Sequence, residues 1–211
     1  MNVTLKEKES VIVKEIAEGT NVLMAAKEML ADQDALKTAT VGVVNGEIVD
    51  LRTELKEGDE FALLSFADKE GKGAFWHTTS HILAQAVKRL YPDCKLAIGP
   101  SIGEGFYYDI DPTSPITADD LPAIEKEMQK IVKEKLPLRR FTLPREEAIE
   151  LMKKKNEPYK VELIEDLPEG EEISFYEQGE YLDLCAGPHL MNTRTVKAFK
   201  LTSVAGAYWR G

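Results

Sequence analysis

The first part of the chain shows short apolar runs separated by turn residues, which is typical of a small α+β domain. Alternating residues at 3–5 and 11–13 predict two strands of a hairpin. Thr20 is a good N-cap for a helix. The apolar positions of that helix recur at helical spacing and include Val22, Leu23, Ala26 and Leu30.

A second hairpin follows this helix. The apolar runs 41–44 and 48–49 flank Asn45-Gly46, the strongest short-range hairpin signal. Residues 61–66 predict a final strand. The order ββαββ with a late added strand predicts a ubiquitin-like β-grasp domain over residues 1–65.

The remainder of the chain is predicted to be a second α+β domain. Residues 66–73 are rich in charge and glycine and predict a linker, so the second domain would cover 74–211. Apolar periodicity predicts helices at 75–90, 121–135 and 145–155. Strand-like residues punctuated by glycines and Pro100 occupy 96–108. Short strands are predicted at 160–164, 173–176, 181–184 and 196–204.

Composition fits a globular protein of the cytoplasm. Hydrophobic residues make up 43% and charged residues 30% of 211 residues. No run approaches the ~20 apolar residues of a membrane-spanning helix, and the first ten residues do not resemble a signal peptide. Two cysteines do not form a disulfide framework. We therefore expect a cytoplasmic protein without a membrane partner.

The charge distribution leaves room for a nucleic acid partner despite a net charge of -10. Residues 130–160 carry ten Lys or Arg against five Asp or Glu, whereas 162–183 carry nine acids and no base. Segregated bases can bind phosphates on an acidic protein, because screening limits each patch to its neighbourhood. Lys153-Lys154-Lys155 is equally explained as a solvated helix end.

The candidate chemistry lies in two four-residue spacings, His77-x-x-x-His81 and Cys185-x-x-x-His189, which include all three histidines. Residues i and i+4 lie on one face of a helix. On a helical wheel with ~100° per residue, His81 falls about 40° from His77. The aliphatic residues of the same helix form a stripe about 140° to 240° from His77. The wheel therefore predicts that both histidines point away from the aliphatic core.

Two kinds of site suit this set of side chains. Zinc accepts His nitrogen and Cys sulfur, so His77, His81, Cys185 and His189 could form a zinc site. The same residues could perform acid–base chemistry without a metal. Spacing alone does not decide between them.

Blocks of sequence follow one another in a recognisable order. They are His77-Thr78-Thr79-Ser80-His81, Ala97-Ile98-Gly99-Pro100, Gly105-Phe106-Tyr107-Tyr108-Asp109, Tyr159-Lys160-Val161, Asp183-Leu184-Cys185-Ala186-Gly187-Pro188-His189 and Gly206-Ala207-Tyr208-Trp209-Arg210-Gly211. Together they resemble the editing domain of the threonyl-tRNA synthetase family, and residues 1–65 resemble the TGS domain that precedes it there. One departure is Ala186, where many members have arginine.

The resemblance implies hydrolysis of mischarged seryl-tRNA(Thr) to serine and free tRNA, without a cofactor. The family's synthetic core attaches threonine to tRNA(Thr) with ATP, contains zinc and forms the homodimer. Its motifs do not occur here, and we expect that core to lie beyond this sequence. Two alternatives stay open: a zinc-dependent editing domain of the alanyl type, and a non-catalytic TGS-type RNA-binding module.

The resemblance also implies a role for each matched residue. His77, Lys160, Asp183 and His189 would be catalytic, and His81, Gly99, Tyr108 and Cys185 would bind the seryl-adenosine end. From the residues alone, Lys160 could be an exposed strand lysine and Asp183 a solvent-facing strand residue. We expect His77→Ala and Lys160→Ala to lose activity with little change in melting temperature. We also expect deletion of residues 1–65 to leave the rate within a few-fold.

Overall fold

The computed structural model describes residues 1–7, 10–31 and 33–209. They form two compact units. The first comprises Met1–Trp76 with Gly187–Met191, and the second comprises His77–Ala186 with the residues from Asn192 onward. Arg210 and Gly211, which end the last sequence block, lie outside the described residues.

Strands and helices alternate irregularly along the chain, which confirms the predicted α+β class. The strands are β1 (Asn2–Lys6), β2 (Val11–Glu15), β3 (Ala39–Val44), β4 (Glu47–Val49), β5 (Glu60–Ser65), β6 (Lys95–Leu96), β7 (Ser101–Ile102), β8 (Gly105–Phe106), β9 (Ile110–Asp111), β10 (Arg139–Thr142), β11 (Ser174–Gln178) and β12 (Tyr181–Leu184). The helices are α1 (Val22–Met29), α2 (Asp34–Thr38), α3 (Lys69–Leu90), η1 (Ala118–Asp120), α4 (Leu121–Glu134), α5 (Arg145–Lys154), α6 (Pro158–Asp166) and η2 (Thr193–Thr195).

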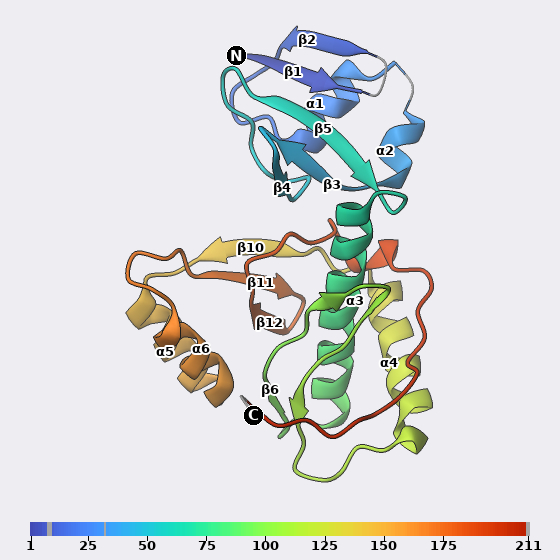
Figure 1. The fold of residues 1–211 in the computed structure, drawn as a ribbon, viewed down its shortest axis with the longest axis vertical. Coiled ribbons are helices and arrows are strands. Elements are labelled where there is room, and N and C mark those ends of the chain that lie inside the picture. Colours follow the sequence, from blue (N-terminus) through green and yellow to red (C-terminus); the bar gives the residue numbers. More distant parts are fainter. Residues whose placement is uncertain (8–9, 32, 210–211) are drawn as a thin grey trace. The chain divides into compact units, whose positions relative to one another are not determined.

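The first unit is built on a mixed five-stranded sheet of the β-grasp kind, as predicted. Its strand order is β2-β1-β5-β3-β4, with β1 and β5 parallel and the other pairs antiparallel (Figure 1). Helix α1 is capped by Asn21, whose side chain accepts from the Met24 N–H, so the cap lies one residue after the predicted Thr20. At the β3–β4 turn, Asn45 and Gly46 both have positive φ, as the hairpin signal requires.

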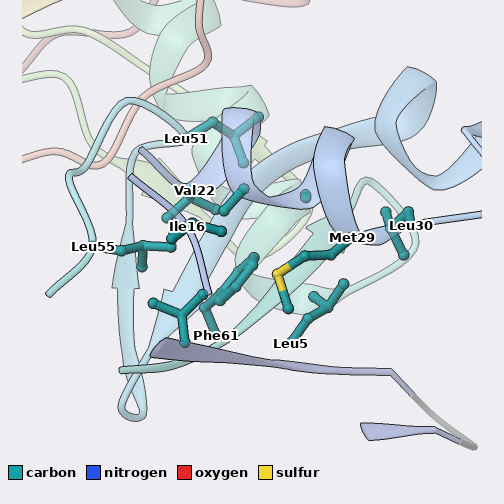
Figure 2. Close-up of a cluster of buried hydrophobic side chains, with 11 residues drawn as sticks. Leu5, Ile16, Val22, Met29, Leu30, Leu51, Leu55 and Phe61 are labelled. Carbon is teal, nitrogen blue, oxygen red and sulfur yellow. The ribbon is translucent and has the colours of Figure 1, made fainter. Parts of the chain in front are cut away.

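A single hydrophobic core joins helix α1 to this sheet. Val22, Ala25, Ala26 and Met29, at helical spacing, are all buried. They pack with Leu5 and Phe61 from the sheet. Figure 2 shows the side chains of Val22 and Met29 pointing from the helix toward Leu5 and Phe61. Leucines from the loop after β4, Leu51 and Leu55, complete the cluster. The amphipathic helix therefore covers the apolar face of the sheet.

The second unit surrounds the C-terminal two-thirds of α3. A three-stranded antiparallel sheet, β10-β11-β12, forms one part, and α5 packs against α6 in another. Helices predicted at 121–135 and 145–155 are confirmed as α4 and α5. No helix in the described part of the chain has the length and apolar character needed to cross a membrane.

Two predicted strands of this unit are wrong. Residues 160–164 belong to helix α6, which begins with Pro158 at its first position, where the missing N–H costs nothing. The five residues there are too few for the apolar pattern to separate a strand from a helix. Residues 196–204 form no regular element.

Helix α3 begins earlier than the periodicity predicts, at Lys69 instead of residue 75. It therefore includes 69–73, the larger part of the predicted linker. Gly71, which suggested a linker, lies inside the helix, where a Cβ atom would lie 2.0 Å from the Ser65 carbonyl oxygen and 2.6 Å from Thr40 Oγ1. The glycine therefore reflects close packing of the start of the helix against β5 and β3 of the first unit.

We predict that Gly71→Ala destabilises the protein although alanine is the better helix former. Helix propensity alone would favour alanine by about 1 kcal/mol. The contact with the Ser65 backbone should reverse that sign and lower the free energy of unfolding by roughly 1–3 kcal/mol. Urea unfolding measures the change. Gly206→Ala is the control, since nothing lies within 4 Å of its Cβ position, and a stabilised Gly71→Ala protein would contradict the packing argument.

Candidate functional site

Helix α3 carries the first two predicted site residues. His77 and His81 are one turn apart, with ring centroids 5.1 Å apart in an edge-to-face arrangement. The aliphatic stripe is buried as the wheel predicts except at Leu90, which ends the helix, but His81 is buried too, at 2% exposed. The helix face at His81 is therefore covered by a second, polar layer of the unit, whereas His77 is partly exposed.

Strand β12 supplies part of that polar layer. Tyr181 and Asp183 alternate along the strand and are both buried. Just beyond the strand, the Cys185 N–H donates to the Ser174 carbonyl (3.0 Å), and the Ser174 hydroxyl donates to the Cys185 carbonyl (2.7 Å). These bonds fix the backbone at Cys185, whose Sγ lies 3.3 Å from His77 Nε2.

Lys160, on helix α6, forms a buried ion pair with Asp183. Its Nζ lies 2.5 Å from Asp183 Oδ1 and donates to the Tyr108 hydroxyl at 3.1 Å. Lys160 is 4% exposed and Asp183 is 3% exposed. The readings of an exposed strand lysine and a solvent-facing aspartate are therefore both wrong, because the two charges compensate each other inside the unit.

Tyrosine hydroxyls satisfy the other oxygen of the aspartate. Tyr108 and Tyr181 donate to Asp183 Oδ2 at 2.6 and 2.9 Å. His81 Nε2 lies 3.4 Å from the same oxygen. Asp183 is therefore the common partner of a lysine, a histidine and two tyrosines.

Gly99 allows Tyr108 to take its place in this cluster. A Cβ atom at residue 99 would lie 2.1 Å from the Tyr108 ring, so only glycine permits the ring to lie against this backbone. Ser80 Oγ lies 2.6 Å from the Gly99 carbonyl, which ties the loop to helix α3. Residue 99 must therefore be glycine because the Tyr108 ring lies close to its backbone, and not because the chain makes a tight turn there.

Burial and the ion pair set the protonation states of the cluster. Burial lowers the pKa of His81 to about 3, against an opposing effect of Asp183, so this imidazole is neutral at pH 7. Burial works to raise the pKa of Asp183, but Lys160 and His81 outweigh it and the pKa is lowered. Burial and then Asp183 raise the pKa values of Tyr108 and Tyr181 well above their usual range. Asp183 is thus ionised beside neutral tyrosines and a neutral histidine.

His189 lies in the segment Gly187–Met191, which groups with the first unit. Its side chain is buried, and its backbone N–H donates to Asp50 Oδ1 at 2.6 Å. The second unit therefore brings together seven of the eight predicted site residues: His77, His81, Gly99, Tyr108, Lys160, Asp183 and Cys185. His189 follows Cys185 by four residues along the chain.

The donor atoms of His77, His81 and Cys185 lie within 4.8 Å of one another. Two imidazoles and a thiolate are ligands that zinc accepts, and a carboxylate behind a ligating histidine is a common supporting group. Asp183 has that position relative to His81. The donor set thus fits zinc as well as it fits acid–base chemistry.

Sequence reasoning missed Tyr181. Its hydroxyl completes the environment of Asp183, and its ring lies edge-on to the His81 ring with centroids 5.9 Å apart. The signal was available, because in a strand Tyr181 shares a face with Asp183, two residues later. A cavity of about 390 Å³ also borders Lys160, Tyr181 and Asp183, together with Lys88 and Arg89 of helix α3.

Comparison with known proteins identifies close relatives. Residues 173–208 match the family described as "Threonyl and Alanyl tRNA synthetase second additional domain". The threonine--tRNA ligase of Caldanaerobacter subterraneus is 59% identical over 198 residues, covering 94% of this chain and 30% of that protein. Those of Acetivibrio thermocellus and Clostridium tetani are each 56% identical, covering 100% of this chain and 32% of each relative. The chain spans about a third of the length of these curated relatives.

The buried ion pair generates a stability prediction that replaces our expectation for Lys160→Ala. Removing Lys160 alone leaves the Asp183 charge buried, which should lower the free energy of unfolding by about 3–5 kcal/mol. Lys160→Met combined with Asp183→Asn removes both charges and should recover much of that loss. Chemical denaturation of the single and double variants measures the coupling. Lys154→Ala, at an exposed position of α5, is the control; a Lys160→Ala protein as stable as this control would show that the pair contributes nothing.

Proposed function

The chain is homologous over nearly its whole length to part of the threonine--tRNA ligases, and we propose that its second unit hydrolyses mischarged seryl-tRNA(Thr) to serine and free tRNA. The observation that carries the proposal is the buried Lys160–Asp183 pair adjoining His81, in the same unit as the His77–Cys185 contact. An ion pair beside histidines and a thiol can supply the charge stabilisation and the proton transfer that ester hydrolysis needs.

Such an activity is needed because a binding pocket for threonine cannot exclude serine efficiently. Serine differs from threonine by one methyl group, and a binding pocket rejects the smaller substrate by only about 1–3 kcal/mol. A separate hydrolytic site can remove the wrong product after it is made. This argument supports a hydrolase within a ligase family.

The reaction requires charge stabilisation and proton transfer. Water attacks the ester carbonyl carbon, a tetrahedral oxyanion forms, and the bond to the tRNA 3′ oxygen breaks as that oxygen gains a proton. Lys160 has three N–H donors, of which the described residues Asp183 and Tyr108 take two. The remaining donor can stabilise the oxyanion or orient the water. Asp183, ionised and fixed by two tyrosines, can orient the water or bind the α-amino group.

The histidines and the cysteine have complementary roles in this proposal. His77, partly exposed and in contact with Cys185, transfers protons near the ester. His81, neutral and buried, contacts the adenosine end and keeps Asp183 in position. Cys185 and His189 line the seryl pocket, and His189 assists proton movement. Gly99 and the ring of Tyr108 form the seat of the terminal adenosine.

We propose that this reaction needs no metal, on the strength of the family resemblance. The alternative is zinc-dependent hydrolysis of the alanyl type, which the clustered donors of His77, His81 and Cys185 favour. In that case zinc would activate the water, and Asp183 would support His81 as a ligand.

The proposed partner is the 3′ end of tRNA(Thr). We further propose that the whole protein acts in the cytoplasm, ligates threonine with ATP and dimerises through the part that the relatives have beyond this chain. These statements follow from the homology, since the ligases are about three times as long as the aligned part.

The central test is single-turnover deacylation of seryl-tRNA(Thr). His77→Ala should lower the rate at least ~100-fold, the usual scale for lost acid–base help. Its melting temperature should stay close to the parent's, because His77 is partly exposed and its loss opens no core cavity. Lys126→Ala, at an exposed position of α4 outside the proposed tRNA-binding lysines, is the control and should deacylate normally. Threonyl-tRNA is the control substrate.

Strong chelation before the assay should leave the rate unchanged. A stoichiometric zinc whose removal abolishes activity would establish the alanyl-type alternative. Binding of tRNA without any release of serine would instead show a non-catalytic RNA-binding module, and normal deacylation by His77→Ala would remove that residue from the mechanism.

The basic residues predict salt-dependent binding. Lys153, Lys154 and Lys155 are exposed at the end of α5, whereas Lys130 pairs with Glu127 and Lys200 with Glu125. Charge reversal of Lys153 and Lys154 to Glu should therefore raise KM with little change in kcat and flatten the salt dependence. Reversal of Lys130 should have a smaller effect. A KM that is insensitive to both salt and Lys153/Lys154 reversal would identify these lysines as a solvated helix end.

A further inference from the structure

We propose that Asp50 and Arg52 of the first unit are positioning residues for the segment Gly187–Met191, which carries His189. The inference rests on the proposed function for its effect on catalysis. It assigns to the β-grasp unit a part in hydrolysis, instead of the dispensable role expected from the sequence.

Two side chains of the first unit bind the backbone of this segment. Asp50 Oδ1 accepts from the His189 N–H at 2.6 Å, and Arg52 Nη1 donates to the Met191 carbonyl at 2.9 Å. Both residues lie in the loop that follows β4. The bonds bracket the segment at residues 189 and 191, so they fix its backbone while using no atom of the His189 imidazole.

Packing supports the same assignment. Met191 packs against the hydrophobic core of the first unit. A charged acceptor on a backbone N–H and a guanidinium on a carbonyl form stronger hydrogen bonds than neutral partners. The segment therefore belongs to the first unit by its polar contacts and by its packing.

The flanking residues are anchored in the second unit. Upstream, the Cys185 backbone bonds to Ser174. Downstream, the Thr193 N–H donates to the Leu136 carbonyl, and its hydroxyl donates to the Ile131 carbonyl at the end of α4. The intervening residues carry the bonds to Asp50 and Arg52. Loss of these two side chains should therefore loosen His189 while leaving Cys185 in place.

The test compares matched variants of the full chain in single-turnover deacylation of seryl-tRNA(Thr). Asp50→Ala and Arg52→Ala should each lower the rate at saturating enzyme by ~10-fold or more, since small displacements of a reacting group cost up to about 100-fold. The apparent affinity for the tRNA should stay within twofold. Asp50→Asn and Arg52→Lys keep an acceptor and a donor and should retain most of the rate.

Asp59→Ala is the control variant. Asp59 accepts from the Lys56 N–H in an exposed turn of the same unit, so its loss tests general damage to that unit. It should deacylate at the parent's rate. If Asp59→Ala loses as much activity as Asp50→Ala, or if both alanine variants act only through a lowered melting temperature, the residues are structural and the positioning role is overturned.

Amide hydrogen exchange tests the contact without any activity. Exchange in the peptide covering 187–191 should accelerate in Asp50→Ala and stay at the parent's rate in Asp59→Ala. If the parent protein releases no serine, the proposed function fails, and the exchange result still decides whether Asp50 holds the segment. Unchanged exchange together with unchanged deacylation in Asp50→Ala would overturn the inference.

Discussion

The buried ion pair between Lys160 and Asp183 is the constraint on which the second unit depends. Removing two charges from water costs several kcal/mol per ion, and their attraction offsets this only with good geometry and further hydrogen bonds. Helix α6 must deliver the lysine, β12 the aspartate, and the loop before β9 the Tyr108 hydroxyl. The arrangement of these three elements therefore follows from one electrostatic requirement.

The same interaction sets the chemistry available at the site. Asp183 stays ionised because Lys160 compensates its burial, and the nearby tyrosines stay protonated because burial, and then the Asp183 charge, raise their pKa values. His81 is neutral because burial outweighs the attraction of Asp183. Its folded pKa is depressed, so its contribution to stability is present above its ordinary value of about 6.5 and is lost as the pH falls below that value. Acid thus weakens the structure and the proposed chemistry through the same residues.

Sequence comparison and geometry inform different parts of the site. The family match at 173–208 includes Asp183, Cys185 and His189, but not His77 or Lys160. Helix α3 and helix α6 bring these two residues to the matched strand, over separations of 108 residues between His77 and Cys185 and 23 between Lys160 and Asp183. The match therefore includes only some of the candidate site residues, and the tertiary structure brings His77 and Lys160 to them.

The sequence by itself determined the features that depend on local physics. Asn45-Gly46 permits the positive φ values of a hairpin, and the apolar period of residues 121–134 requires an amphipathic helix. The four-residue spacings and ordered blocks also identified the residues that the second unit gathers. Only the tertiary structure decided whether the run 160–164 is strand or helix, why Gly71 and Gly99 must be glycine, and that Tyr181 belongs beside Asp183. In each case the residue or atom that decides the outcome is distant in the sequence, so the local pattern cannot show it. Burial of Lys160 depends on a carboxylate in another element. Gly71 and Gly99 must be glycine because folding brings another atom within van der Waals distance of their backbone.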